Sequence, residues 1–68
     1  MAKRHNFYFN GKNYGYVVFE NEKMIDMQFA DPQLHLDMVR WVDGKEFSSI
    51  SDMLGRSAAM WRIEEVDV

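Results

Sequence analysis

The chain has 68 residues, 47% of them hydrophobic and 15% aromatic, no cysteine and a formal net charge of −3. Without cysteine, neither a disulfide nor a zinc–thiolate site can reinforce a domain of this size, so aliphatic and aromatic packing must stabilise it. No run approaches the roughly 18 apolar residues of a membrane span, and the first residues lack the apolar stretch of a signal peptide, so we expect one soluble, cytoplasmic domain over residues 1–68.

The first half of the chain is predicted to form three strands. Residues 6–9 are aromatic and β-prone. Asn10 and Gly11 are the strongest short signal for a hairpin turn, because both central positions of a type I′ turn need positive φ. Residues 14–19 and 24–29 are the second and third predicted strands. The short links between these segments favour an antiparallel meander.

Alternation within the strands predicts which side chains share a face. Tyr14 and Tyr16 are expected on one face of the second strand. Ile25, Met27 and Phe29 are expected on the inward face of the third strand.

A helix is predicted over residues 32–43. Asp31 is a good N-cap, Pro32 suits the first helical position, and apolar residues then recur at helical spacing. The alternative is a hairpin, since apolar and polar residues also alternate here and Asp43 with Gly44 could form a turn. The Asp-Pro start favours the helix.

A second, short helix is predicted to start at Ser48 or Ser49 and to end at Gly55. Alternatively, this helix continues to Trp61 with the glycine inside it. Residues 60–68 alternate and are rich in β-branched side chains, which predicts a last strand.

These segments predict an α+β fold. It comprises a small antiparallel sheet, formed by an N-terminal three-stranded meander and a C-terminal strand, with one or two short helices packed on one face. The predicted core consists of Phe9, Val17 or Phe19, Ile25, Met27, Phe29, Leu34, Met38, Trp41, Leu54 and Trp61.

Residues 12–19, Lys-Asn-Tyr-Gly-Tyr-Val-Val-Phe, resemble the RNP1 signature of RNA recognition motifs and cold-shock domains. The segment departs from that signature where asparagine replaces a glycine and where Tyr16 replaces a phenylalanine. The resemblance covers only these residues. It implies that Tyr14 and Tyr16 stack on bases from one face of a strand, that Lys12 reaches phosphate and that Gly15 lets a base approach the backbone.

The sequence contains no pattern typical of catalysis or metal binding. His5 and His35 are isolated, and both are expected at the surface or its boundary. The serines have no histidine nearby in sequence to activate them, and no glycine-rich phosphate loop follows a strand. We therefore expect no enzymatic activity, no metal and no cofactor.

The leading hypothesis is a non-enzymatic module that binds another protein or forms a homodimer. By analogy with compact acidic chains of this size, it would be a phage- or plasmid-type effector that inhibits or modulates a host protein. The alternative is single-stranded RNA or DNA binding through the RNP1-like strand Lys12–Phe19. The surface predicted for either function consists of Arg4, Tyr8, Lys12, Tyr14 and Tyr16. The acidic side chains expected to face a basic partner are Asp37, Asp43, Glu46 and Asp52.

Overall fold

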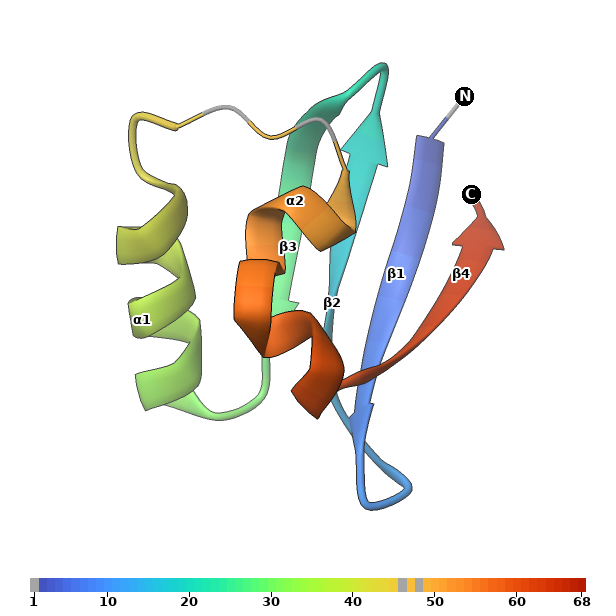
Figure 1. The fold of residues 1–68 in the computed structure, drawn as a ribbon, viewed down its shortest axis with the longest axis vertical. Coiled ribbons are helices and arrows are strands. Elements are labelled where there is room, and N and C mark those ends of the chain that lie inside the picture. Colours follow the sequence, from blue (N-terminus) through green and yellow to red (C-terminus); the bar gives the residue numbers. More distant parts are fainter. Residues whose placement is uncertain (1, 46, 48) are drawn as a thin grey trace.

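The computed structural model describes residues 2–45, 47 and 49–68, and it shows a four-stranded antiparallel sheet with helices packed on it (Figure 1). The strands are β1 (Ala2–Phe9), β2 (Lys12–Glu20), β3 (Lys23–Phe29) and β4 (Arg62–Asp67). The helices are α1 (Pro32–Val42) and α2 (Ile50–Leu54), and α2 continues as the 3₁₀ helix η1 (Gly55–Met60). The strand order is β3-β2-β1-β4, so the C-terminal strand returns to pair with the first. The predicted α+β fold is confirmed.

Two tight hairpins connect the meander. Asn10 and Gly11 have φ values of 51° and 76°, as the predicted turn requires. Asn21 and Glu22 also have positive φ, at 52° and 64°, although neither is glycine. β1 begins at Ala2, earlier than predicted, because it lies inside the sheet with a partner strand on each side.

The capping residues expected from the sequence begin both helices. Asp31 caps α1, where its Oδ1 accepts a hydrogen bond from the Gln33 backbone N–H at 3.3 Å. The predicted helix is therefore confirmed over the hairpin alternative, and it ends at Val42. Ser49 caps α2, where its Oγ accepts a hydrogen bond from the Asp52 backbone N–H at 3.1 Å.

The chain changes direction and helix type at Gly55. This residue has a φ of 55° and ends α2, after which the backbone tightens into η1. The alternative of one continuous α-helix to Trp61 is therefore wrong. Ser48, the other predicted cap, lies outside the described residues.

The core lies between the helices and one face of the sheet. Its buried cluster consists of Phe7, Val17, Phe19, Phe29, Met53 and Leu54. The apolar side of α1, including Leu34 and Met38, packs against this cluster. Phe9 and Trp41 were predicted in the core, but they are 40% and 49% exposed. Phe7, which the prediction left out, is fully buried because β1 is an inner strand.

A bulge in β3 changes the inward face that was predicted for that strand. Adjacent residues of β2 pair with Asp26 and Met24, so Ile25 has no partner across the ladder. Ile25 is 56% exposed, whereas Met24 and Met27 pack against the core. The inward position predicted for Ile25 is therefore wrong, because simple alternation assumes an uninterrupted ladder.

Candidate binding face of the sheet

The helices pack on one face of the sheet and, in the part of the chain that the structure describes, leave the other face open (Figure 1). His5 and Phe7 point toward the helix side, where they are buried. Alternation along β1 and the pairing registers define the opposite face, which we call the open face. It carries Arg4, Asn6 and Tyr8 from β1, Tyr16 and Val18 from β2, Asp26 and Gln28 from β3, and Arg62, Glu64 and Val66 from β4.

Tyr16 lies at the centre of a contact chain that crosses the open face. The Arg4 guanidinium carbon is 3.9 Å from the centre of the Tyr16 ring. The Tyr16 hydroxyl donates a hydrogen bond to Asp26 Oδ2 at 3.2 Å. The ring is therefore held by a cation on one neighbouring strand and by a carboxylate on the other.

Glu64 on β4 extends this arrangement to the last strand. Its Oε1 accepts a hydrogen bond from Asn6 Nδ2 at 3.2 Å and a longer one from the Tyr8 hydroxyl at 3.5 Å. Arg4 Nε in turn donates to Asn6 Oδ1 at 2.9 Å. The Arg62 guanidinium lies 5.7 Å from the Tyr8 ring centre. Polar and aromatic side chains of all four strands are thus joined.

We call these connected side chains the open-face cluster: Arg4, Asn6, Tyr8, Tyr16, Asp26, Arg62 and Glu64. Val18 lies on the same face and is only 8% exposed although no described helix covers it. Neighbouring side chains of the open face must therefore cover it, which shows that the cluster is packed. Sequence reasoning selected Arg4, Tyr8 and Tyr16 but missed the rest, which only the register between strands brings into contact.

Tyr14 does not belong to the open-face cluster, because β2 has a second bulge there. Asn13 and Gly15 pair with consecutive residues of β1, which leaves Tyr14 unpaired between them. Its ring packs edge-on against Phe9 at 6.2 Å and Trp61 at 5.6 Å between ring centres. Tyr14 is therefore part of an aromatic group at the end of the sheet.

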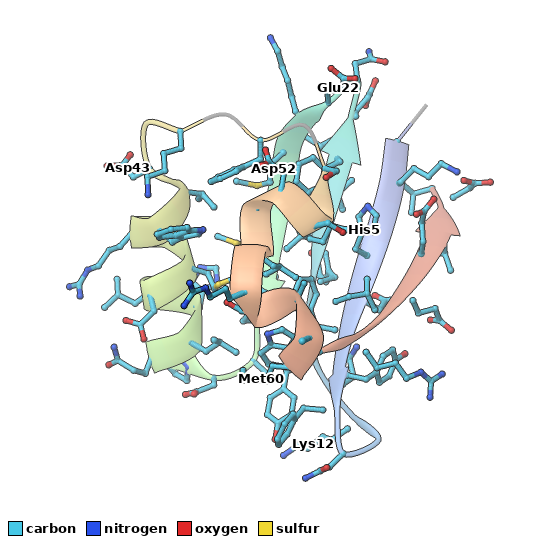
Figure 2. The ribbon with its side chains drawn as sticks, in the orientation of Figure 1. His5, Lys12, Glu22, Asp43, Asp52 and Met60 are labelled. Atoms are coloured by element: carbon cyan, nitrogen blue, oxygen red, sulfur yellow. The ribbon has the colours of Figure 1, made fainter. Side chains whose placement is uncertain are left out.

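The predicted shared face of Tyr14 and Tyr16 is wrong: the bulge places their rings on opposite sides of the sheet. Lys12 accompanies Tyr14, with its Nζ 5.5 Å from the ring centre. Figure 2 shows Lys12 at the β1–β2 hairpin, at the opposite end of the molecule from Glu22. The two stacking rings that the RNP1 resemblance implied do not form one platform.

Gly15 is required by strand packing. A Cβ atom there would meet the backbone carbonyl oxygen of Gln28 and would lie 2.7 Å from Phe29 Cα. Its φ is also 147°, which L side chains rarely adopt. The space on the Cβ side of Gly15 is therefore filled by β3, so strand packing by itself explains why this residue is glycine.

The predicted acidic surface lies on separate elements. Asp37 is on α1 and accepts a hydrogen bond from Gln33 Nε2 at 2.9 Å. Asp43 follows the end of α1, while Asp52 is in the first turn of α2 (Figure 2). Glu46 lies outside the described residues. The three described carboxylates do not join the open-face cluster, and their proposed role toward a basic partner remains a prediction.

His5 is buried, and the prediction of a surface or boundary position is wrong for this residue. It is 7% exposed, it packs edge-on against Phe19, and its Nδ1 has no hydrogen-bond partner within the described chain. Burial lowers the pKa of the imidazole, and the nearby carboxylate of Glu65 partly opposes that effect.

His35 has a structural role at the edge of the sheet, where its Nδ1 accepts a hydrogen bond from the Phe29 backbone N–H at 3.3 Å. Across residues 2–45, 47 and 49–68, no three histidine or carboxylate side chains are grouped closely enough to hold a metal ion.

Comparisons with known proteins identified no related family, protein or structure. No protein-family model matches the chain, and no curated protein or solved structure is significantly similar to it. Among the described helices, none has the length and apolar character needed to cross a membrane.

Proposed function

We propose that the protein is a non-enzymatic module that binds another protein through its open face. The observation that supports this most is the open-face cluster, in which Arg4 and two tyrosines are held in place by neighbouring side chains. Arginine and tyrosine are among the residues that contribute most to protein–protein binding. Because these side chains are already ordered, docking costs less conformational entropy. If the partner is a host factor, the module acts as an effector that modulates it by docking.

The charge of the open face favours a protein over a nucleic acid as the partner. Arg4 and Arg62 supply positive charges, and Asp26 and Glu64 supply negative ones beside them. Nucleic-acid surfaces need an excess of cations, because neutralisation of phosphates provides most of the non-specific affinity. In addition, the guanidinium of Arg4 already covers one face of the Tyr16 ring, where a base would have to stack.

Photochemical crosslinking from the open face tests this proposal. We expect a benzoylphenylalanine at position Tyr8 to trap one partner, and the same group at Gln33 on α1 to leave it untrapped. Tyr16→Ala should reduce capture roughly tenfold or more, whereas the matched control Tyr14→Ala, on the other side of the sheet, should retain it. A product with twice the mass of the chain would identify a second copy as the partner. Equal capture by the two alanine variants would refute the proposal.

Single-stranded nucleic acid is the second candidate ligand, at the hairpin end of the sheet. The observation in its favour is the position of the Lys12 ammonium near the Tyr14 ring, with Phe9 partly exposed beside it. A labelled oligonucleotide titrated at low and moderate salt tests this site. Tyr14→Ala is expected to weaken binding by about 1–3 kcal/mol for the lost stack. Absence of binding at low salt would exclude the site.

A further inference from the structure

The two edges of the sheet differ in how their backbone groups are satisfied. On β3, the N–H of Ala30 donates to Tyr14 O at 3.0 Å. Alternate residues of an antiparallel strand point their backbone groups to opposite sides, so the N–H groups of Met27 and Phe29 point outward. Both are occupied: Asp26 Oδ1 accepts from Met27 at 2.8 Å, and His35 Nδ1 accepts from Phe29.

The β3 edge has further protection against another strand. Its bulge at Ile25 interrupts the ladder, and α1 lies alongside it (Figure 1). Bulges and covering helices are among the devices by which proteins block edge strands, and side chains that occupy the outward N–H groups have the same effect. This edge is therefore closed.

The β4 edge carries charged side chains but, in the described part of the chain, has no bulge, no side-chain cap and no covering helix. Val68 N–H donates to Ala2 O at 3.3 Å, so the even-numbered residues of β4 face β1. The backbone N–H and C=O groups of Ile63, Glu65 and Asp67 consequently point outward. No described side chain bonds these N–H groups, and Figure 1 shows β4 on the side of the sheet away from α1. Its open backbone can accept another strand.

The charge on β4 indicates what kind of strand fits. Glu64, Glu65 and Asp67 supply three carboxylates, and Lys3 binds two of them at 3.2 and 3.0 Å. Arg62 is the cation on β4 itself, so this strand carries more carboxylates than cations. Ile63 and Val66 alternate with these charged side chains on the two faces of β4 and provide apolar contacts for an added strand.

A second copy of β4 fits this edge poorly. Symmetric antiparallel pairing places residues of the same sheet face opposite each other. The two registers with the greatest overlap then put Glu64 against Glu64, or Glu65 against Glu65. Like charges placed directly opposite each other are destabilising, so the charge pattern disfavours a dimer formed through this edge.

We propose that the β4 edge binds an extended cationic segment of another protein, in which lysine or arginine alternates with apolar residues, as an additional antiparallel strand. Main-chain hydrogen bonds to Ile63, Glu65 and Asp67 provide affinity, and the carboxylates of β4 select the basic side chains. This inference uses backbone groups of the edge and does not rest on docking through the open-face cluster.

Amide NMR of the full chain with a short acetylated and amidated peptide, in which lysine alternates with valine, tests the proposal. Saturating peptide is expected to slow hydrogen exchange at the amides of Ile63, Glu65 and Asp67 roughly tenfold or more, with the β3 amides unchanged. A peptide in which glutamate replaces lysine is the charge control and is expected not to bind. Binding that leaves these three exchange rates unchanged would overturn the proposal, as would no binding at low salt.

A variant of the chain and a modified peptide distinguish backbone pairing from simple charge attraction. Glu65→Pro removes one outward N–H at a position where an edge strand tolerates proline. It should weaken binding roughly three- to tenfold relative to Glu65→Ala, which keeps that N–H. Should the proline variant fail to fold, the wild-type chain with a peptide N-methylated on its pairing side gives the same test. Equal binding of the methylated and unmethylated peptides, or a dimer that protects the same amides without peptide, overturns the proposal.

Discussion

The Arg4 guanidinium carbon lies 3.9 Å from the centre of the Tyr16 ring, and the hydroxyl of the same tyrosine donates to Asp26. A cation on the face of a ring and an anion at its hydroxyl fix the tyrosine from two neighbouring strands. These contacts tie β1, β2 and β3 together by side chains as well as by their backbone ladders, and the hydrogen bond from Asn6 to Glu64 does the same for β1 and β4. The open-face cluster should therefore contribute to folding stability, in addition to its proposed role in binding a partner.

Arg4→Ala is expected to lower the free energy of unfolding by about 1–2 kcal/mol. The loss combines the contact with the Tyr16 ring and the hydrogen bond from Nε to Asn6. The matched control is Arg56→Ala, at an exposed position on η1, which should stay within about 0.5 kcal/mol of the wild type. Urea unfolding followed by circular dichroism measures both values, and equal losses would show that the ring contact contributes nothing.

Gly15→Ala is expected to destabilise the fold by about 3 kcal/mol or more, because the new Cβ would overlap the backbone of β3. Gly11→Ala is the control: Gly11 also has positive φ, at 76°, but no atom lies within 4 Å of its added Cβ. Gly11→Ala should therefore lower the free energy of unfolding by only about 1–2 kcal/mol, through backbone strain. Thermal unfolding of the two variants compares them, and similar melting temperatures would contradict the close approach of β2 and β3.

Burial of His5 predicts a pH-dependent stability. Burial lowers the pKa of the folded imidazole below its ordinary value of 6.5, with Glu65 opposing the shift and Lys3 adding to it. Below pH 6.5 the unfolded chain therefore binds more protons than the folded chain. The contribution of His5 to the free energy of unfolding is complete above pH 6.5 and is lost as the pH falls through the pKa of the folded state.

The control variant for this effect is His5→Phe. It removes the titrating group and the Nδ1 atom that has no partner among the described residues. Replacing an unsatisfied buried polar group by an apolar one can be neutral or stabilising. The variant should therefore match the wild type near neutral pH and lose less stability between about pH 7 and pH 5. Parallel pH profiles of the two proteins would show that His5 does not cause the dependence.

The features that sequence alone predicted are those encoded locally. Asn10 with Gly11 defines a turn, and Asp31 with Pro32 begins a helix, because backbone conformation and capping depend on adjacent residues. The C-terminal strand was predicted from its alternation in the same way. These local signals were sufficient to predict the correct fold class.

The features that sequence did not predict depend on pairing between strands. The bulges at Tyr14 and Ile25 each displace one side chain from simple alternation. Gly15 beside the first bulge is a local signal, because a glycine inside a strand often marks a bulge, whereas no glycine lies beside Ile25. The burial of His5 follows from the inner position of β1, which exists only because β4 pairs with it. The contacts of Glu64 across the open face depend on the same pairing.

Trp41 connects the two helices and gives a final prediction. Its Nε1 donates to Met53 O at 2.7 Å, and Lys45 Nζ lies 3.7 Å from its ring centre. Trp41→Phe keeps an aromatic ring for the Lys45 ammonium but leaves the Met53 carbonyl without this donor. The lost hydrogen bond should lower the free energy of unfolding by about 1–2 kcal/mol. Lys45→Ala removes only the cation and should cost about 0.5–1 kcal/mol. Urea unfolding followed by far-ultraviolet circular dichroism compares them. A Trp41→Phe loss no greater than that of Lys45→Ala would mean that the hydrogen bond does not hold α1 to α2, and that the half-exposed indole acts only through its ring.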